Sequence, residues 1–279
     1  MTSTLRADGR QIMIDANGVP IAVTEYAAAG RAAPPVVLLH GIGSRAQSWW
    51  PVTDSLADRF RVYAVDLRGH GSSGKPEQGY LFEDYAADLD AILDTLALEE
   101  PRIVGASLGA LITLIWASAR PGRAAALVLE DPSLRTQPEI LGAFDGWQAL
   151  AALPLADAAA WYHQQYPDWS EEDCWRRAEA ITSTAPGVFA ELRAAAEAAM
   201  ATGVTHRIDL LGTIPTPALL LHGNPELGSM VHPEDAERFV QTLPRARKAY
   251  LPSAGHNLHR EAADEFLAEV IPFLDRAGW

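Results

Sequence analysis

Gly105-Ala106-Ser107-Leu108-Gly109 carries the strongest structural signal in this chain. The apolar run 102–105 leads into the serine, and a helical pattern over 107–119 follows it. A G-x-S-x-G motif between a strand and a helix predicts a nucleophile elbow, a strained turn that lifts a serine above the carboxyl edge of a parallel sheet. The flanking glycines suit this turn because they carry no Cβ atom that would clash there. The same letters also fit an ordinary helix that begins at a serine, so the interpretation depends on what surrounds the motif.

Short apolar runs like the one before Ser107 recur along the chain, separated by helical patterns. They predict strands that are buried on both faces of a sheet, at 36–40, 61–66, 102–105, 126–129, 218–222 and 246–251. The helical patterns cover 48–58, 82–97, 107–119, 233–243 and 260–275. An antiparallel hairpin is expected first, with strands at 11–15 and 19–26 and a turn at Asn17-Gly18. The alternation predicts an α/β fold with a mostly parallel, eight-stranded sheet and helices on both faces.

This alternation stops after Asp131 and resumes at Pro215. The segment between contains no convincing strand, but it holds helical patterns rich in alanine and tryptophan at about 138–152, 155–165, 170–182 and 187–202. We interpret 135–212 as a helical cap inserted into a single α/β core domain that comprises 1–134 and 213–279.

Composition and charge exclude several classes of partner. The 279 residues include 36 acidic and 22 basic side chains, a formal net charge of −14, and a single cysteine. Binding to nucleic acid or to anionic lipid needs a basic surface, so neither partner is expected. One cysteine forms no internal disulfide, no apolar run approaches the roughly 18–20 residues of a membrane span, and the first ten residues lack the apolar core of a signal peptide. We expect a cytoplasmic protein that acts on a small molecule; its oligomeric state does not follow from the sequence.

Two further motifs supply what a serine nucleophile needs. His40-Gly41-Ile42-Gly43 ends an expected strand, so the backbone N–H groups of Ile42 and Leu108 are candidates for an oxyanion hole. Gly255-His256 follows the last expected strand. A serine hydroxyl is a weak nucleophile, and it needs an imidazole to accept its proton and a carboxylate to orient that imidazole. His256 is the candidate for the imidazole.

With these motifs the chain resembles the α/β-hydrolase superfamily, in the branch of small cap-bearing esterases, lactonases and C–C bond hydrolases. The resemblance extends from about residue 20 to the end and rests on His40-Gly41-Ile42-Gly43, Asp66-Leu67-Arg68-Gly69-His70-Gly71-Ser72-Ser73, Gly105-Ala106-Ser107-Leu108-Gly109 and Gly255-His256. It implies catalysis by a Ser-His-acid triad with Ser107 as nucleophile, and it implies neither a metal nor an organic cofactor.

The acid of this triad has two candidates. Most relatives carry it after the strand that follows the cap, where Glu226 fits, although the loop 222–231 is longer and more apolar than usual. A second group, which includes haloalkane dehalogenases and zearalenone-type lactonases, carries it one strand earlier, where Asp131 lies 24 residues after Ser107. Strand alternation sends Glu130 and Asp131 to opposite sides, so only one of them can face His256. Asp131 is preferred, and Glu226 is the alternative.

Other polar and aromatic residues have less specific interpretations. Trp147, Trp161 and His163 are candidates for substrate binding, because they lie in aromatic stretches of the cap. His40 and His70 are expected in structural turns. His259 is expected at the surface.

The predicted function is hydrolysis of an ester or lactone of a small, largely apolar molecule through an acyl-enzyme. The resemblance also leaves open C–C bond hydrolysis of vinylogous diketones. A non-catalytic ligand-binding protein on the same fold is a third possibility, because a fold does not dictate a function. A serine nucleophile argues against dehalogenase and epoxide-hydrolase chemistry, in which an aspartate attacks an alkyl carbon.

Overall fold

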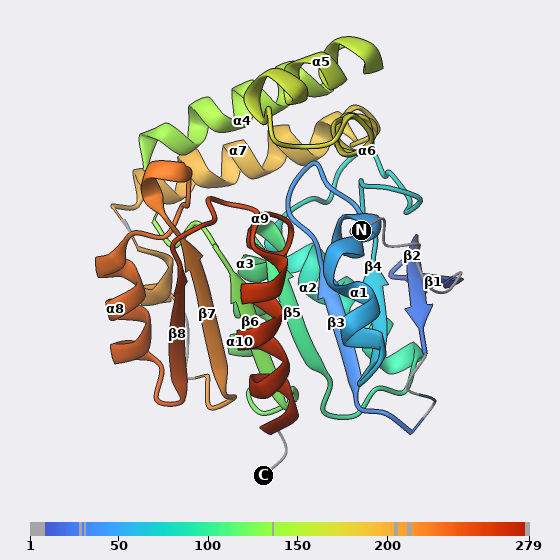
Figure 1. Ribbon diagram of the computed structural model, residues 1–279, viewed down its shortest axis with the longest axis vertical. Coiled ribbons are helices and arrows are strands. Elements are labelled where there is room, and N and C mark those ends of the chain that lie inside the picture. Colours follow the sequence, from blue (N-terminus) through green and yellow to red (C-terminus); the bar gives the residue numbers. More distant parts are fainter. Residues whose placement is uncertain are drawn as a thin grey trace.

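The apolar runs form the strands of one eight-stranded sheet, seen in a computed structural model that describes residues 9–27, 30, 32–135, 137–203, 206–210 and 214–276 (Figure 1). The strands are β1 (Arg10–Ala16), β2 (Val19–Tyr26), β3 (Pro35–Leu39), β4 (Arg61–Val65), β5 (Arg102–Ala106), β6 (Ala126–Glu130), β7 (Ala218–Gly223) and β8 (Ala246–Leu251). Their order is β1-β2-β4-β3-β5-β6-β7-β8, and only the pairs that involve β2 are antiparallel. The predicted mostly parallel sheet is confirmed.

Helices cover both faces of this sheet because its central strands are apolar on both sides. Val37 and Leu39 of β3 belong to a cluster with α2 (Phe82–Thr95), α3 (Leu108–Ala119) and α8 (Pro233–Thr242). Val36 and Leu38 face the other way and pack in a cluster with α1 (Trp50–Ala57), α9 (Leu258–Glu261) and α10 (Ala263–Arg276). The helix expected over 260–275 corresponds to α10, and the separate short helix α9 precedes it. Short 3₁₀ turns occupy Ala46–Trp49, Arg207–Leu210 and Pro225–Leu227.

Four further helices lie between β6 and β7 in the chain. They are α4 (Pro138–Ala151), α5 (Leu155–Gln165), α6 (Glu171–Thr182) and α7 (Pro186–Ala201), and we call them the inserted helices. Figure 1 shows them stacked across one end of the sheet, in green to orange, above the loops that follow β3, β5 and β6. They match the four helical patterns of the sequence.

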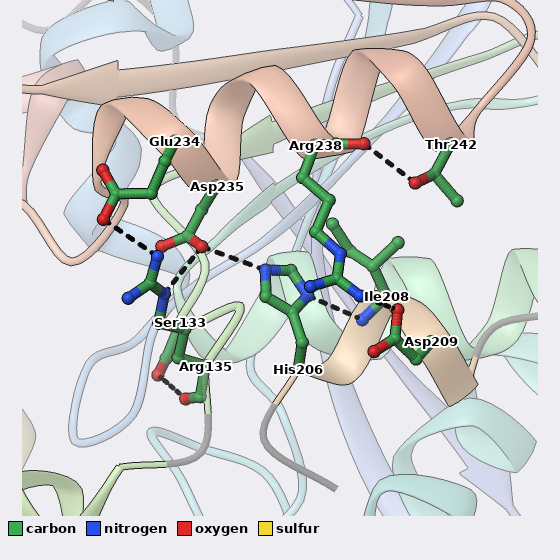
Figure 2. Close-up of polar contacts among 9 residues, drawn as sticks. All are labelled: Ser133, Arg135, His206, Ile208, Asp209, Glu234, Asp235, Arg238 and Thr242. Atoms are coloured by element: carbon green, nitrogen blue, oxygen red, sulfur yellow. Dashed lines mark hydrogen bonds and ion pairs between the residues drawn. The ribbon is translucent and has the colours of Figure 1, made fainter.

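Both ends of the inserted segment are held by α8 (Figure 2). Arg135 precedes the inserted helices and His206 follows them, and the two residues form an isolated antiparallel bridge. Arg135 Nε donates to Asp235 Oδ1 at 2.7 Å, and His206 Nε2 lies 3.0 Å from the same oxygen. Arg135 also pairs with Glu234 at 2.9 Å. These contacts tie the start and the end of the insertion to one point on the sheet domain, which helps to keep the inserted helices in place above the sheet.

Candidate active site

Ser107 sits on a strained turn between β5 and α3. Its backbone has φ 50° and ψ −108°, a conformation that costs a residue other than glycine about 1–3 kcal/mol. A Cβ atom at Gly105 would lie 2.4 Å from the Gly109 carbonyl oxygen, and one at Gly109 would lie 2.1 Å from the Leu39 carbonyl oxygen. Only glycine fits at these two positions, so the motif permits a close turn that brings Ser107 to the end of the sheet.

The serine opens on a cavity of about 100 Å³ between the sheet and the inserted helices. Ser107, His256 and the Gly41-Ile42 segment line it from the side of the sheet. Aromatic side chains of α4 and α5, including Trp147 and Trp161, line it from the opposite side. A substrate held in this space would contact the serine and the aromatic surface together.

The N–H groups of Ile42 and Leu108 are both next to Ser107 and available to a ligand. Leu108 is the first residue of α3 and directly follows the serine. The loop after β3 also passes close to the serine, because a Cβ atom at Gly41 would lie 3.3 Å from the Ser107 Cβ. In the described ranges neither N–H donates to a protein acceptor. Two free donors beside a serine can stabilise a negatively charged oxygen.

Two buried histidines hold the loop that carries Ile42. His40 Nδ1 donates to the Gly41 carbonyl at 2.8 Å, and its Nε2 accepts from the Leu67 N–H. His70 Nε2 accepts from the Gly43 N–H at 3.1 Å. Burial lowers the pKa of His40 to about 4 and that of His70 to about 3, so both rings are neutral near pH 7 and can accept these bonds.

His256 is paired with Asp131. Its Nδ1 lies 2.6 Å from Asp131 Oδ2, so the other ring nitrogen is left free to exchange protons. Burial disfavours the charged imidazole, but the hydrogen bond and the charge of Asp131 outweigh it and raise the pKa of His256 above 6.5. Ser107 and His256 line the same cavity, while no hydrogen bond joins their side chains in the part of the chain that the structure describes.

The unusually long loop after β7 surrounds the Asp131 carboxylate. The Ser229 hydroxyl and the Val231 N–H donate to Oδ1 at 2.6 and 3.1 Å, and the Met230 N–H donates to Oδ2 at 2.8 Å. Asp131 is fully buried, and its φ of 42° turns it away from the direction of β6. Glu226 lies exposed on the same loop, and its side chain forms no hydrogen bond within the described ranges. The structure thus places Asp131, rather than Glu226, beside His256.

A second acid–histidine pair lies beside the first. Glu130 is fully buried, and both of its carboxylate oxygens lie 2.8 Å from His259 Nδ1. The His259 ring also stacks on Trp49, with 4.2 Å between ring centroids. The expectation that His259 lies at the surface is therefore wrong. Two adjacent acids at a strand end, followed far along the chain by histidines three residues apart, are the only sequence signal of this pair.

The inserted helices bring a different set of residues to the cavity than the sequence indicated. Trp147 and Trp161 line it as expected, whereas His163 is exposed and does not line it. Successive residues of a helix are rotated by about 100°, so α5 directs Trp161 and Tyr162 at the cavity and His163 away from it. Tyr166 and Trp169, from the aromatic and tryptophan-rich stretches of the insertion, also line the cavity. Two further lining residues were not anticipated: Arg177 of α6 and Arg260 of α9.

The described residues contain no helix long and apolar enough to cross a membrane. Nor do they contain a group of three histidine, cysteine, aspartate or glutamate side chains that could hold a metal ion.

Comparisons with known proteins agree with this architecture. The family model of the alpha/beta hydrolase fold matches residues 34–263. A 2-(acetamidomethylene)succinate hydrolase of Mesorhizobium japonicum is 29% identical over 249 residues, which cover 87% of this chain and 88% of that protein. An N-formylmaleamate deformylase of Pseudomonas putida is 29% identical over 285 aligned positions, with 98% of each chain covered. The solved structure of an E-2-(acetamidomethylene)succinate hydrolase has a TM-score of 0.80 and 23% identity, and it covers 96% of this chain and 100% of that chain.

Proposed function

This chain belongs to the alpha/beta hydrolase fold family, and from that membership and the geometry of the cavity we propose that it is a serine hydrolase that works through an acyl-enzyme. Ser107 is the nucleophile, His256 the general base and Asp131 the acid that orients it. The N–H groups of Ile42 and Leu108 form the oxyanion hole. The observation that carries this proposal is the 2.6 Å contact between Asp131 and His256 at the cavity onto which the strained Ser107 opens.

Each step of the reaction follows from these positions. His256 accepts the Ser107 proton, and the serine Oγ attacks the substrate carbonyl carbon. The oxygen of that carbonyl takes up negative charge and accepts hydrogen bonds from Ile42 and Leu108, each worth about 3–4 kcal/mol of the barrier. The protonated His256 then gives its proton to the leaving group as the bond to the acyl carbon breaks. Water, deprotonated by His256, releases the acid and restores the serine.

The scissile bond is that of a carboxylic ester or lactone in our first proposal. A second candidate is an acyl group on nitrogen, because two of the relatives are named for 2-(acetamidomethylene)succinate and N-formylmaleamate. Hydrolysis of either bond proceeds through the same kind of acyl-enzyme. The two reactions differ in the leaving group that His256 must protonate, an alcohol or an amine nitrogen.

We also propose that the inserted helices act as a cap, with 135–212 forming the lid of a core made of 1–134 and 213–279. Support comes from the cavity, which has residues of α4, α5 and α6 on one side and the nucleophile on the other. Excluding water from this space strengthens every electrostatic contact inside it.

A fluorophosphonate probe tests the nucleophile directly. The intact protein should gain the mass of one adduct, on the peptide that contains Ser107, and Ser107→Ala should gain none. Hydrolysis of aryl acetates and of N-formyl compounds by the same preparation would then rank the two bond types. An unlabelled wild-type protein, together with full hydrolysis by Ser107→Ala, would overturn the proposal. Ser118→Ala, at the far end of α3, serves as the matched control.

A further inference from the structure

The cavity that holds Ser107 also has two arginines on its wall, Arg177 from α6 and Arg260 from α9. Among the residues that the structure describes, Glu130 is the only acidic side chain that lines the same cavity, and His259 already engages both of its oxygens. Guanidinium groups stay charged at any ordinary pH. A cavity wall with two fixed positive charges and one occupied carboxylate is complementary to an anion.

Arg177 has no acidic partner in the described part of the chain. Its neighbour on the same helix, Arg176, pairs with Glu172 on the exposed face. Leaving a half-buried charge without a counter-ion costs free energy that a bound anion would recover.

The guanidinium of Arg177 also has donors to spare. It donates to the carbonyl oxygens of Gly43 and, at 3.4 Å, Ile42. An arginine carries five N–H donors, so these two bonds leave others for a ligand. They also locate the group: it lies against the loop whose Ile42 N–H we assign to the oxyanion hole. An anionic group of the substrate that binds Arg177 would therefore be separated by only a few bonds from the carbonyl that Ser107 attacks.

Arg260, from α9, supplies the second charge. Its side chain is only 10% exposed and forms an ion pair with Asp173 at 3.0 Å. Burial lowers the pKa of Arg260; Asp173 opposes that effect, and the positive charge of Arg177 adds to it. The two arginines thus repel each other, and an anion bound by both would relieve that repulsion.

Aromatic rings hold both guanidinium groups in place. Arg177 lies over Tyr162 at 5.4 Å from the ring centroid, and Arg260 lies over Trp169 at 4.6 Å. Tyr162 and Trp169 are themselves stacked, together with Tyr166. A guanidinium plane that stacks on a ring keeps its N–H edge free, which is the edge that binds a carboxylate.

We propose that the substrate of this site carries a free carboxylate a few bonds from the scissile acyl group, and that Arg177 and Arg260 bind it. The inference rests on the proposed serine hydrolase function and goes beyond the prediction of a largely apolar substrate. The aromatic surface contacts the carbon chain of the substrate, and the two arginines select its charged end.

Half-esters of short dicarboxylic acids test this proposal against neutral esters of equal length. Monoethyl succinate and monoethyl glutarate are compared with ethyl butanoate and ethyl pentanoate, in which a methyl group replaces the carboxylate. The wild-type kcat/KM should be at least about tenfold higher for the half-esters. In Arg177→Met the half-ester value should fall about 50-fold. The neutral-ester value should fall several-fold less, because it loses only the support that Arg177 gives to the Ile42–Gly43 loop. Arg176→Met, the adjacent arginine on the exposed face, should change neither.

Binding measurements separate this inference from the proposed function. Calorimetry with Ser107→Ala should show saturable binding of glutarate, and the double variant Ser107→Ala/Arg177→Met should bind it at least tenfold more weakly. Hydrolysis of neutral esters with no preference for half-esters and no glutarate binding would overturn the inference and leave the hydrolase proposal intact. Glutarate binding that depends on Arg177, without turnover of any ester, would uphold the inference and count against the hydrolase. Equal losses on both ester types in Arg177→Met, with glutarate binding unchanged, would assign Arg177 to the support of the Gly43 loop alone.

Discussion

Glu130 and Asp131 are adjacent residues, both fully buried, and each is paired with a histidine three residues from the other's partner. The pairs differ in their surroundings. The His256 side chain is 27% exposed and faces the cavity, whereas that of His259 is 7% exposed and stacks on Trp49. Asp131 accepts three further hydrogen bonds from the loop after β7, and no loop surrounds Glu130 in this way within the described ranges.

A carboxylate–imidazole contact alone does not identify a catalytic pair. A general base needs one ring nitrogen oriented by an acid and the other accessible to substrate. We assign catalysis to Asp131–His256 on this ground. The Glu130–His259 pair also borders the cavity, but its side chains are almost fully buried. It joins the end of β6 to α9 and so helps to hold the loop that carries His256.

The two pairs should differ most in the kcat of variants in which the acid is replaced by its amide. Asp131→Asn should lower kcat by about 10⁴-fold, because the amide no longer holds the imidazole in the required tautomer or stabilises its charged form. Steady-state kinetics on the best ester substrate measures this effect. Glu226→Gln, which changes the other acid that the sequence offered, should stay within twofold of wild type. A larger loss in Glu226→Gln than in Asp131→Asn would reverse the assignment.

Glu130→Gln should act on stability rather than on the chemical step. Replacing a buried charged acceptor weakens its bonds to His259, and the free energy of unfolding should fall by about 2 kcal/mol. Urea unfolding followed by tryptophan fluorescence measures that loss. The kcat of the folded enzyme should remain within about fivefold of wild type. If this variant folds and yet loses activity as severely as Asp131→Asn, then the two pairs act together in catalysis.

The pH dependence of kcat/KM should distinguish the two pairs by a smaller effect. His256 must be neutral to accept the serine proton, and Asp131 raises its pKa, so kcat/KM should rise with pH along a limb whose midpoint lies above 6.5. In stability, the raised pKa means that the contribution of protonated His256 is fully present below pH 6.5 and is lost as the pH rises through the folded-state value. Glu130→Gln should lower this midpoint slightly, because the charge of Glu130 also raises the pKa of His256, although less than the hydrogen bond and the charge of Asp131 do. A midpoint below 6.5 in the wild type would contradict the Asp131–His256 coupling.

The sheet and the elbow could be predicted from the sequence because both arise from local rules. Apolar runs of four to six residues have to be buried on both faces, and β3 to β7 are so buried almost throughout. Gly105 and Gly109 predict close backbone contacts, because glycine has no side chain that would prevent them. The helices of the insertion could also be predicted, because the spacing of apolar residues along a helix depends only on residues that are close in the sequence.

Side-chain partnerships across the chain could not be predicted in the same way. The sequence offered Asp131 and Glu226 as alternatives, and the long loop that made Glu226 doubtful proves to be the set of donors around Asp131. His259 was expected outside and is buried, because α9 packs against Trp49. His163 was expected in the cavity and is exposed, because the rotation of α5 about its own axis is decided by its packing against α6.

The sequence by itself determined the order of strands and helices, the place of the insertion and the position of the candidate nucleophile. Only the packing of the whole chain decided which acid contacts His256 and which arginines line the cavity. The physical reason is the range of the interactions: hydrophobic periodicity and glycine turns act between neighbours in the chain. The Asp131–His256 bond instead joins residues 125 positions apart, and Arg177 and Arg260 meet at one cavity only after β6, the inserted helices and α9 have packed together.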